Sequence, residues 1–169
     1  MSNGVIRRID SLGRVVIPIS IRKKLNMQID DLVEIDVDDT KVEIRKHSSL
    51  HGSEDIFVKI CSSLQSITKG TIVLFDQEKI VTSYGEEKNK YKKETIIPKQ
   101  IRIKLLNKDG TFDKGIIVDD EVYYLMFPLL GEYSKVKGGI MLISNDYFIQ
   151  NHRPLIKSYA IFIEEMINN

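Results

Sequence analysis

The sequence predicts two folded units: a small β-rich module over residues 1–50 and an α+β domain over residues 51–169. Three observations lead to this prediction. Short alternating apolar segments occupy residues 5–45, whereas longer helical and strand patterns begin after residue 53. The polar connection 46–52 separates the two patterns. A length of 169 residues suits one ordinary domain or two small ones.

The first module is predicted to hold, in chain order, strands at 5–9 and 15–17, a helix at 18–25 and a hairpin of strands at 33–37 and 42–44. Asp10 to Gly13 should form the first turn, because glycine accepts positive φ. Pro18 suits the first turn of a helix. Ile17, Ile21 and Leu25 place one apolar stripe on that helix.

About 45 residues with so few large apolar side chains bury too little surface to be stable alone. The single cysteine, Cys61, excludes a disulfide, and no set of metal ligands is present in the pattern. The module is therefore expected to need a second copy of the chain.

The second domain is predicted to contain helices at 53–68, 98–107 and 154–167 and strands at 71–75, 79–82, 121–129 and 138–144. Ser53 is a candidate N-cap, and the run 84–95 lacks periodicity and should be a solvated loop. The closing helix is predicted to bury the face made by Leu155, Tyr159, Phe162 and Met166. Tyr123, Tyr124 and Tyr133 are interpreted as packing residues.

Charge is segregated along the chain, although the formal net charge is only +1. Residues 1–24 hold six basic residues and one acid, a balance of +5. Residues 25–44 hold seven acids and one lysine, a balance of −6, and the remainder from residue 51 is neutral. Any electrostatic function is therefore assigned to the first 24 residues.

The stretch from Gly4 to Asn26 contains the run Asp-x-x-Gly-Arg-x-x-Ile-Pro-x-x-x-Arg, which begins at Asp10. This run resembles the DNA-binding module of the AbrB family of transition-state regulators, and the resemblance continues to about Lys46. The family resemblance implies a swapped-hairpin dimeric barrel in which two chains interleave their strands. It also implies that the partner is double-stranded promoter DNA.

Carried over position by position, the resemblance implies the DNA-contacting residues Arg7, Arg8, Arg14, Arg22 and Lys23. Lys23 stands where relatives usually have a second arginine, so it keeps the charge but loses the planar fork that grips a base edge in two places. We therefore expect DNA shape and flexibility to be read more than a strict sequence.

The second half resembles, more faintly, the GAF-like sensor domain of sporulation regulators in this family. That resemblance implies a role in sporulation-stage gene expression. Two tasks remain open for this domain: binding a small molecule between the sheet and helix 98–107, or assembling dimers into tetramers through helices 53–68 and 154–167. The alternative for the whole chain is an antitoxin of the same barrel fold, but such proteins use disordered acidic tails, and residues 51–169 are apolar, patterned and neutral.

The sequence offers little for catalysis, so the chain is predicted not to be an enzyme and to need no cofactor or metal. Its histidines are His47, His51 and His152, and Cys61 falls within an apolar helix pattern. Segment 97–105 echoes segment 17–25 but lacks the preceding Asp-x-x-Gly-Arg, so it is interpreted as an ordinary amphipathic helix. With no leader and no apolar run of about 18 residues, a cytoplasmic, nucleoid-associated protein is expected.

Overall fold

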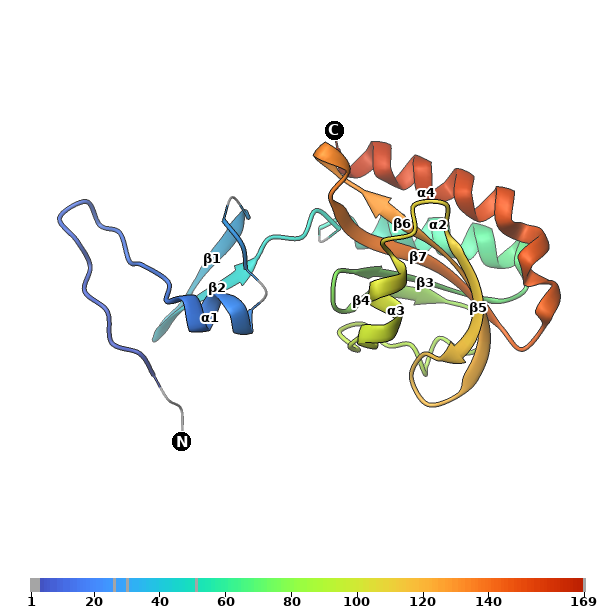
Figure 1. Cartoon of the computed structure of the whole chain (residues 1–169), viewed down its shortest axis with the longest axis horizontal. Coiled ribbons are helices and arrows are strands. Elements are labelled where there is room, and N and C mark those ends of the chain that lie inside the picture. Colours follow the sequence, from blue (N-terminus) through green and yellow to red (C-terminus); the bar gives the residue numbers. More distant parts are fainter. Residues whose placement is uncertain (1–3, 26, 30, 51, 169) are drawn as a thin grey trace. The chain divides into compact units, whose positions relative to one another are not determined.

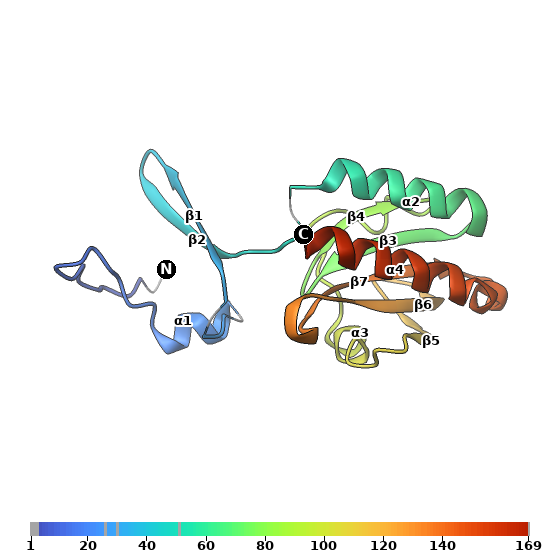
Figure 2. The same cartoon turned by 90° about the horizontal axis from the view of Figure 1, so that it is seen from above.

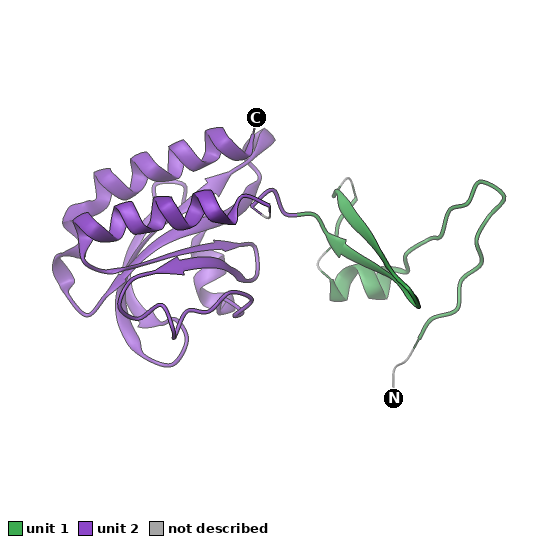
Figure 3. Ribbon diagram, turned by 180° about the vertical axis from the view of Figure 1, so that it is seen from behind, with its two compact units in different colours: residues 1–47 green, residues 48–169 purple. Residues whose placement is uncertain are grey.

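A computed structural model describes residues 4–25, 27–29, 31–50 and 52–168. The chain divides into two compact units, Met1–His47 (unit 1) and Ser48–Asn169 (unit 2), which Figure 3 distinguishes by colour. Each unit has its own secondary structure and is described by itself. No helix in the described part of the chain combines the length and apolarity needed to span a membrane.

Unit 1 contains the helix α1 (Ile19–Lys24) and the strands β1 (Val33–Asp38) and β2 (Lys41–Lys46) (Figure 1). The two strands pair antiparallel, from Val33 opposite Lys46 to Asp38 opposite Lys41. The predicted helix and hairpin are confirmed. The turn at Asp10 is also present, with Gly13 at φ 76° and its N–H donating to the Asp10 carbonyl over 3.0 Å.

The strands predicted at 5–9 and 15–17 are wrong for the single chain. Described residues 4–17 form no ladder, although their backbone bends back at the turn so that the Asp10 N–H donates to the Arg14 carbonyl over 3.0 Å. Their apolar side chains are uncovered, with Ile6 92% and Val16 75% exposed. A strand needs a neighbour for its backbone and a surface for its apolar face, and unit 1 supplies neither for this segment.

Unit 2 is built of the helices α2 (Glu54–Thr68), α3 (Lys99–Lys104) and α4 (Arg153–Ile167), the strands β3 (Thr71–Asp76), β4 (Ile80–Tyr84), β5 (Thr111–Ile116), β6 (Glu121–Leu130) and β7 (Val136–Ser144), and the 3₁₀ turns η1 (Glu132–Ser134) and η2 (Tyr147–His152). The strands form one sheet in the order β4-β3-β7-β6-β5, in which all neighbours are antiparallel. An α+β layout over these residues agrees with the expectation. Strand β5 was missed, because Asp113, Lys114 and Gly115 interrupt its apolar pattern at the exposed edge of the sheet.

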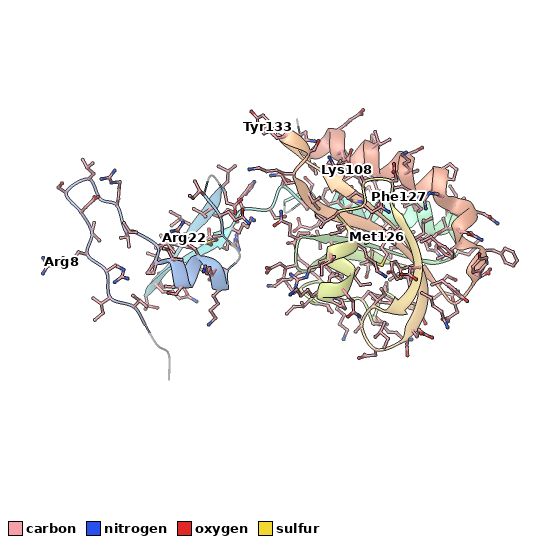
Figure 4. All side chains as sticks on the ribbon, in the orientation of Figure 1. Arg8, Arg22, Lys108, Met126, Phe127 and Tyr133 are labelled. Carbon is pink, nitrogen blue, oxygen red and sulfur yellow. The ribbon has the colours of Figure 1, made fainter. Side chains whose placement is uncertain are left out.

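Both faces of this sheet are buried. Helices α2 and α4 cover one face (Figure 2), where Phe57, Leu64 and Ile156 pack with Phe127. Helix α3 and the loop before it cover the other face, which includes Met126. Met126 and Phe127, labelled in Figure 4, therefore lie on opposite faces of β6, as the two-residue period of a strand requires. Each large side chain buried in this way contributes about 1.5–3 kcal/mol.

The buried face of α4 differs from the prediction. The buried residues are Ile156, Ala160 and Ile163, whereas Phe162 is 50% exposed. Helix α4 carries apolar residues on two adjacent stripes, so its periodicity alone could not decide which stripe contacts the sheet.

Two tyrosines also depart from expectation. Tyr91, in the loop predicted to be solvated, is only 1% exposed and belongs to the core beside α3. Tyr133, predicted to pack, is 92% exposed in η1 and has φ 55° (Figure 4). Tyr124 is buried, in agreement with the prediction.

Cys61 is buried in α2, as predicted, and burial raises the pKa of its thiol to about 12. The thiol is therefore fully protonated at neutral pH, and a protonated thiol is a poor nucleophile.

Strand β7 passes so close to β3 that only glycine fits at residue 138. A Cβ atom added to Gly138 would lie 2.1 Å from the carbonyl oxygen of Phe75, whereas one added to Gly115 would meet only the Tyr124 ring at 3.6 Å. We expect Gly138→Ala to lower the free energy of unfolding by about 2–3 kcal/mol, because the two strands must separate. Gly115→Ala, the matched control in strand β5, should change it by less than about 0.5 kcal/mol. Urea unfolding of the two variants measures the difference, and equal stabilities would contradict the close approach.

Candidate nucleic-acid interface

The turn at Asp10 orders Arg14. The Asp10 carboxylate accepts the backbone N–H of Leu12 and of Arg14, each over 2.9 Å, and the Arg14 Nε–H over 2.8 Å. These contacts, above all the Arg14 backbone N–H, hold the pKa of Asp10 below its ordinary value. Since the ion pair uses Nε, the terminal nitrogens of Arg14 have no bond within the described residues, and its side chain is largely exposed.

Helix α1 gathers three cations in its last turn: Arg22, Lys23 and Lys24. It follows Pro18, whose φ of −58° and ψ of 146° lead the chain into the helix. Lys23 and Lys24 are exposed, but Arg22 is half-buried, and its Nε atom is buried with no hydrogen-bond partner in the described part of the chain. An unpaired buried donor is costly, so Arg22 is incompletely satisfied within one chain.

Arg7 and Arg8 are exposed on the extended segment, and Arg8 is labelled in Figure 4. The Nη1 group of Arg7 donates to the neighbouring carbonyl of Ile6 over 3.1 Å. The structure thus places Arg7, Arg8 and Arg14 on residues 4–17, and Arg22 and Lys23 together on α1. All five lie in unit 1.

Carboxylates of unit 1 engage a different set of cations, on the β1–β2 hairpin. Arg45 binds Glu34 over 2.6 Å and Asp36 over 2.9 Å, and His47 Nδ1 lies 2.8 Å from Glu34. The contacts with His47 and then Arg45 lower the pKa of Glu34. The hairpin cations are therefore neutralised locally, while Arg7, Arg8 and Arg22 have no carboxylate partner among the described residues.

Unit 1 also contains an open apolar hollow of about 190 Å³. Its lining joins the extended segment, α1 and β2: Val5, Arg7, Val15, Val16, Ile17, Pro18, Ile21, Leu25, Met27 and Ile44. A hollow lined by so many apolar side chains is an exposed patch of the kind that marks an interaction surface.

Unit 2 offers no comparable concentration of cations with an apolar hollow. Side chains of Phe75, Ile101, Leu105 and Met126 fill the space between the sheet and α3, where the sequence left room for a ligand. Helix α3 repeats the local geometry of α1, with Pro98 at φ −54° and ψ 141°, but its Ile101 is buried in the core. Segment 97–105 is thus an amphipathic packing helix, as predicted. Within the described residues, no three histidine, cysteine, aspartate or glutamate side chains gather as a metal site would require.

The sequence singled out the cations but missed Asp10 as a positioning residue. The signal was available: an aspartate four residues before an arginine, across a turn with glycine at its end, is the pattern of an Asx turn. It was interpreted only as part of the turn.

Comparison with known proteins assigns residues 6–50 to the family described as "Antidote-toxin recognition MazE, bacterial antitoxin". A solved structure of the "N-terminal DNA Recognition Domain" of AbrB from Bacillus subtilis is 47% identical, covers 28% of this chain and 89% of that domain, and has a TM-score of 0.26.

Three proteins of Bacillus subtilis are similar in sequence. The transition state regulatory protein AbrB is 48% identical over 46 residues, which is 27% of this chain and 48% of AbrB. Stage V sporulation protein T is 32% identical over 96 residues, which is 56% of this chain and 54% of that protein. The chain thus spans about half the length of these two relatives.

The putative transition state regulator Abh is 37% identical over 73 residues, which is 43% of this chain and 78% of Abh. The matches to Abh and to stage V sporulation protein T are longer than unit 1, so both extend into unit 2. On this similarity, the chain belongs to the AbrB family of transition-state regulators.

Proposed function

We propose that this protein is a transcriptional regulator whose unit 1 binds double-stranded promoter DNA. The main observation is the turn in which Asp10 orders an exposed Arg14, beside a helix whose Arg22 lacks a partner for its buried Nε. Cations without carboxylate partners are what a phosphate backbone attracts. The description of the AbrB N-terminal domain as a DNA recognition domain supports the same function.

The DNA-binding form is proposed to be a dimer of unit 1. Residues 4–17 have exposed apolar side chains and no strand neighbour among the described residues, and the apolar hollow between this segment, α1 and β2 is open. A second copy of the chain would cover the hollow and pair the segment, which gives the swapped-hairpin barrel. Dimerisation would also double the cations available to DNA.

Contacts to phosphates would dominate recognition, and Arg7, Arg8, Arg14, Arg22 and Lys23 are the proposed contact residues. Lysine binds phosphate as a point charge, whereas an arginine fork can also read a guanine. With Lys23 in place of an arginine, DNA shape and deformability should contribute more to selectivity than base contacts.

Unit 2 is proposed to be a GAF-like regulatory domain that joins dimers into tetramers. Helices α2 and α4 cover the same face of the sheet and carry exposed apolar side chains, including Ile56, Ile67, Ile161 and Phe162. The similarity to stage V sporulation protein T, which extends past unit 1, supports a role in sporulation-stage expression. An antitoxin function is less consistent with unit 2, because residues 48–169 have a core of their own rather than the composition of an unfolded tail.

Replacement of Arg14 by alanine should weaken promoter binding by about tenfold or more per dimer, because a charge-assisted contact is lost on each chain. The slope of log K against log salt should fall by about one phosphate per chain. Fluorescence anisotropy with a promoter fragment at several salt concentrations measures both quantities. Lys41→Ala, which removes one exposed positive charge from the β1–β2 turn, is the control and should change neither. Unchanged affinity for a folded Arg14→Ala dimer would exclude the assignment.

Asp10→Ala gives a prediction of opposite sign to simple charge counting. Removing a negative charge near DNA should strengthen binding, but we expect weaker binding, by about threefold to tenfold, because Arg14 loses the two acceptor oxygens that order it. Asp38→Ala, which removes an equal charge from the hairpin, should bind at least as tightly as the unmodified protein. Tighter binding by Asp10→Ala in the same anisotropy assay would show that Asp10 has no positioning role.

A charge on the exposed helix surface should reduce the tetramer to a dimer. We expect Ile67→Lys with Phe162→Lys to halve the mass measured by light scattering, because an apolar interface must then desolvate charges. Ile103→Lys is the matched control, since Ile103 is an equally exposed isoleucine on α3, over the opposite face. Equal masses for both variants, or a dimeric unmodified protein, would contradict assembly through α2 and α4.

A further inference from the structure

An open pocket of about 360 Å³ lies in unit 2 between the start of α2, the edge strand β4 and the loop 85–95. Its lining residues come from all three elements: Glu54, Val58, Val81, Thr82, Ser83, Lys88, Asn89, Lys92 and Lys93. This volume falls in the range of small-molecule sites, which begins at about 300 Å³. The pocket is separate from the core beside α3, which side chains fill.

The loop that carries the three lysines is held in place. The Ser83 hydroxyl donates to the carbonyl of Tyr91 over 2.7 Å, and the Tyr91 ring is buried in the core. Ile80 pairs with the end of the loop, donating to the Thr95 carbonyl over 2.9 Å and accepting from the Glu94 N–H over 2.8 Å. The backbone of this wall of the pocket is therefore ordered without a ligand.

The start of the loop is fixed as well. Gly85 has φ 140°, and a Cβ atom at this position would lie 2.7 Å from Thr71 Cα. The chain can therefore press against β3 only because residue 85 is glycine. A pocket bounded by such a loop loses little conformational entropy when it binds a ligand.

The pocket has an excess of positive charge. Lys93 binds Glu54 over 3.1 Å, and the backbone N–H of Glu54 and then Lys93 hold the pKa of that carboxyl below its ordinary value. Lys88 and Lys92 have no carboxylate partner among the residues that the structure describes, although Lys88 lies over the Tyr84 ring at 5.8 Å from its centre. Two ammonium groups are thus available on one side of the pocket.

The rest of the lining suits the body of a small organic molecule. Val58 and Val81 supply apolar surface, and Thr82, Ser83 and Asn89 supply polar groups. No arginine lines the pocket, so a planar bidentate grip is not offered; lysine ammonium groups act as point charges, which suit the rounded charge of a phosphate.

We propose that this pocket binds a small phosphate monoester, with the phosphate between Lys88 and Lys92 and the organic part against Val58 and Val81. The site would make unit 2 responsive to a phosphorylated metabolite. This inference goes beyond DNA binding by unit 1, and binding at the pocket can be measured without DNA.

Phenyl phosphate is a suitable probe, because it joins one phosphate monoester to one apolar ring. With the full-length protein, we expect saturable shifts of the Val58 and Val81 methyl signals in NMR spectra and a Kd of about 1–10 mM, as a fragment of this size allows. Phenol, which lacks the phosphate, should cause no saturable shift at the same concentrations. Absence of saturation by phenyl phosphate would overturn the proposal.

Lys88→Ala with Lys92→Ala should weaken phenyl phosphate binding by about tenfold or more, because two charged contacts are lost. Lys88→Arg with Lys92→Arg should retain binding within about threefold, since it keeps both charges. The control Lys99→Ala with Lys108→Ala removes two exposed lysines outside the pocket and should leave binding unchanged. Equal weakening in the control would reduce the effect to overall charge and overturn the site.

DNA phosphates are the other source of the same chemistry, and they are tested separately. Promoter affinity of the Lys88→Ala, Lys92→Ala variant, measured without phenyl phosphate, should match that of the unmodified protein. A loss of promoter affinity, combined with unshifted Val58 and Val81 methyls, would assign these lysines to the DNA backbone and reject the pocket. Failure of Arg14→Ala to affect DNA binding would instead bear only on unit 1.

Discussion

Apolar side chains in residues 4–17 have nothing to pack against within one chain, and most features of unit 1 depend on this shortage. Ile6 and Val16 face solvent, and the hollow formed with α1 and β2 stays open. A module of 47 residues buries too small a fraction of its surface to remain folded by itself. A second chain supplies both a strand neighbour and an apolar cover, so stability and DNA binding are coupled through the same contact.

Electrostatics in unit 1 follows from where the carboxylates find partners. Glu34 and Asp36 bind Arg45, and Glu34 also binds His47, so the acidic hairpin satisfies its own cations. Asp10 is the exception, because it lies in the basic segment and orders Arg14 rather than removing it from use. The neighbouring blocks of opposite charge therefore remain functionally distinct, although they nearly cancel in the total.

Unit 2 divides its tasks between the surfaces of one sheet. Helices α2 and α4 bury one face and expose a second apolar stripe for assembly. The other face is closed by α3 and Tyr91, which leaves no space for a ligand there. The pocket instead lies at the edge strand β4, where an anchored loop presents lysines beside an apolar surface. A regulator with this layout can separate ligand binding from its core packing.

The sequence by itself determined the local elements and the charge pattern, because helix α1, the β1–β2 hairpin and the basic segment depend on neighbours in the chain. It also carried the family motif from Asp10 to Arg22. Tertiary structure decided the rest. Strand β5 forms despite Asp113 and Gly115 because β6 supplies its hydrogen bonds, and α4 buries Ile156 rather than Phe162 because of how it lies on the sheet. The position of Tyr91 in the core, and hence the wall that holds Lys88 and Lys92, depends on contacts between segments far apart in the sequence, which no local pattern encodes.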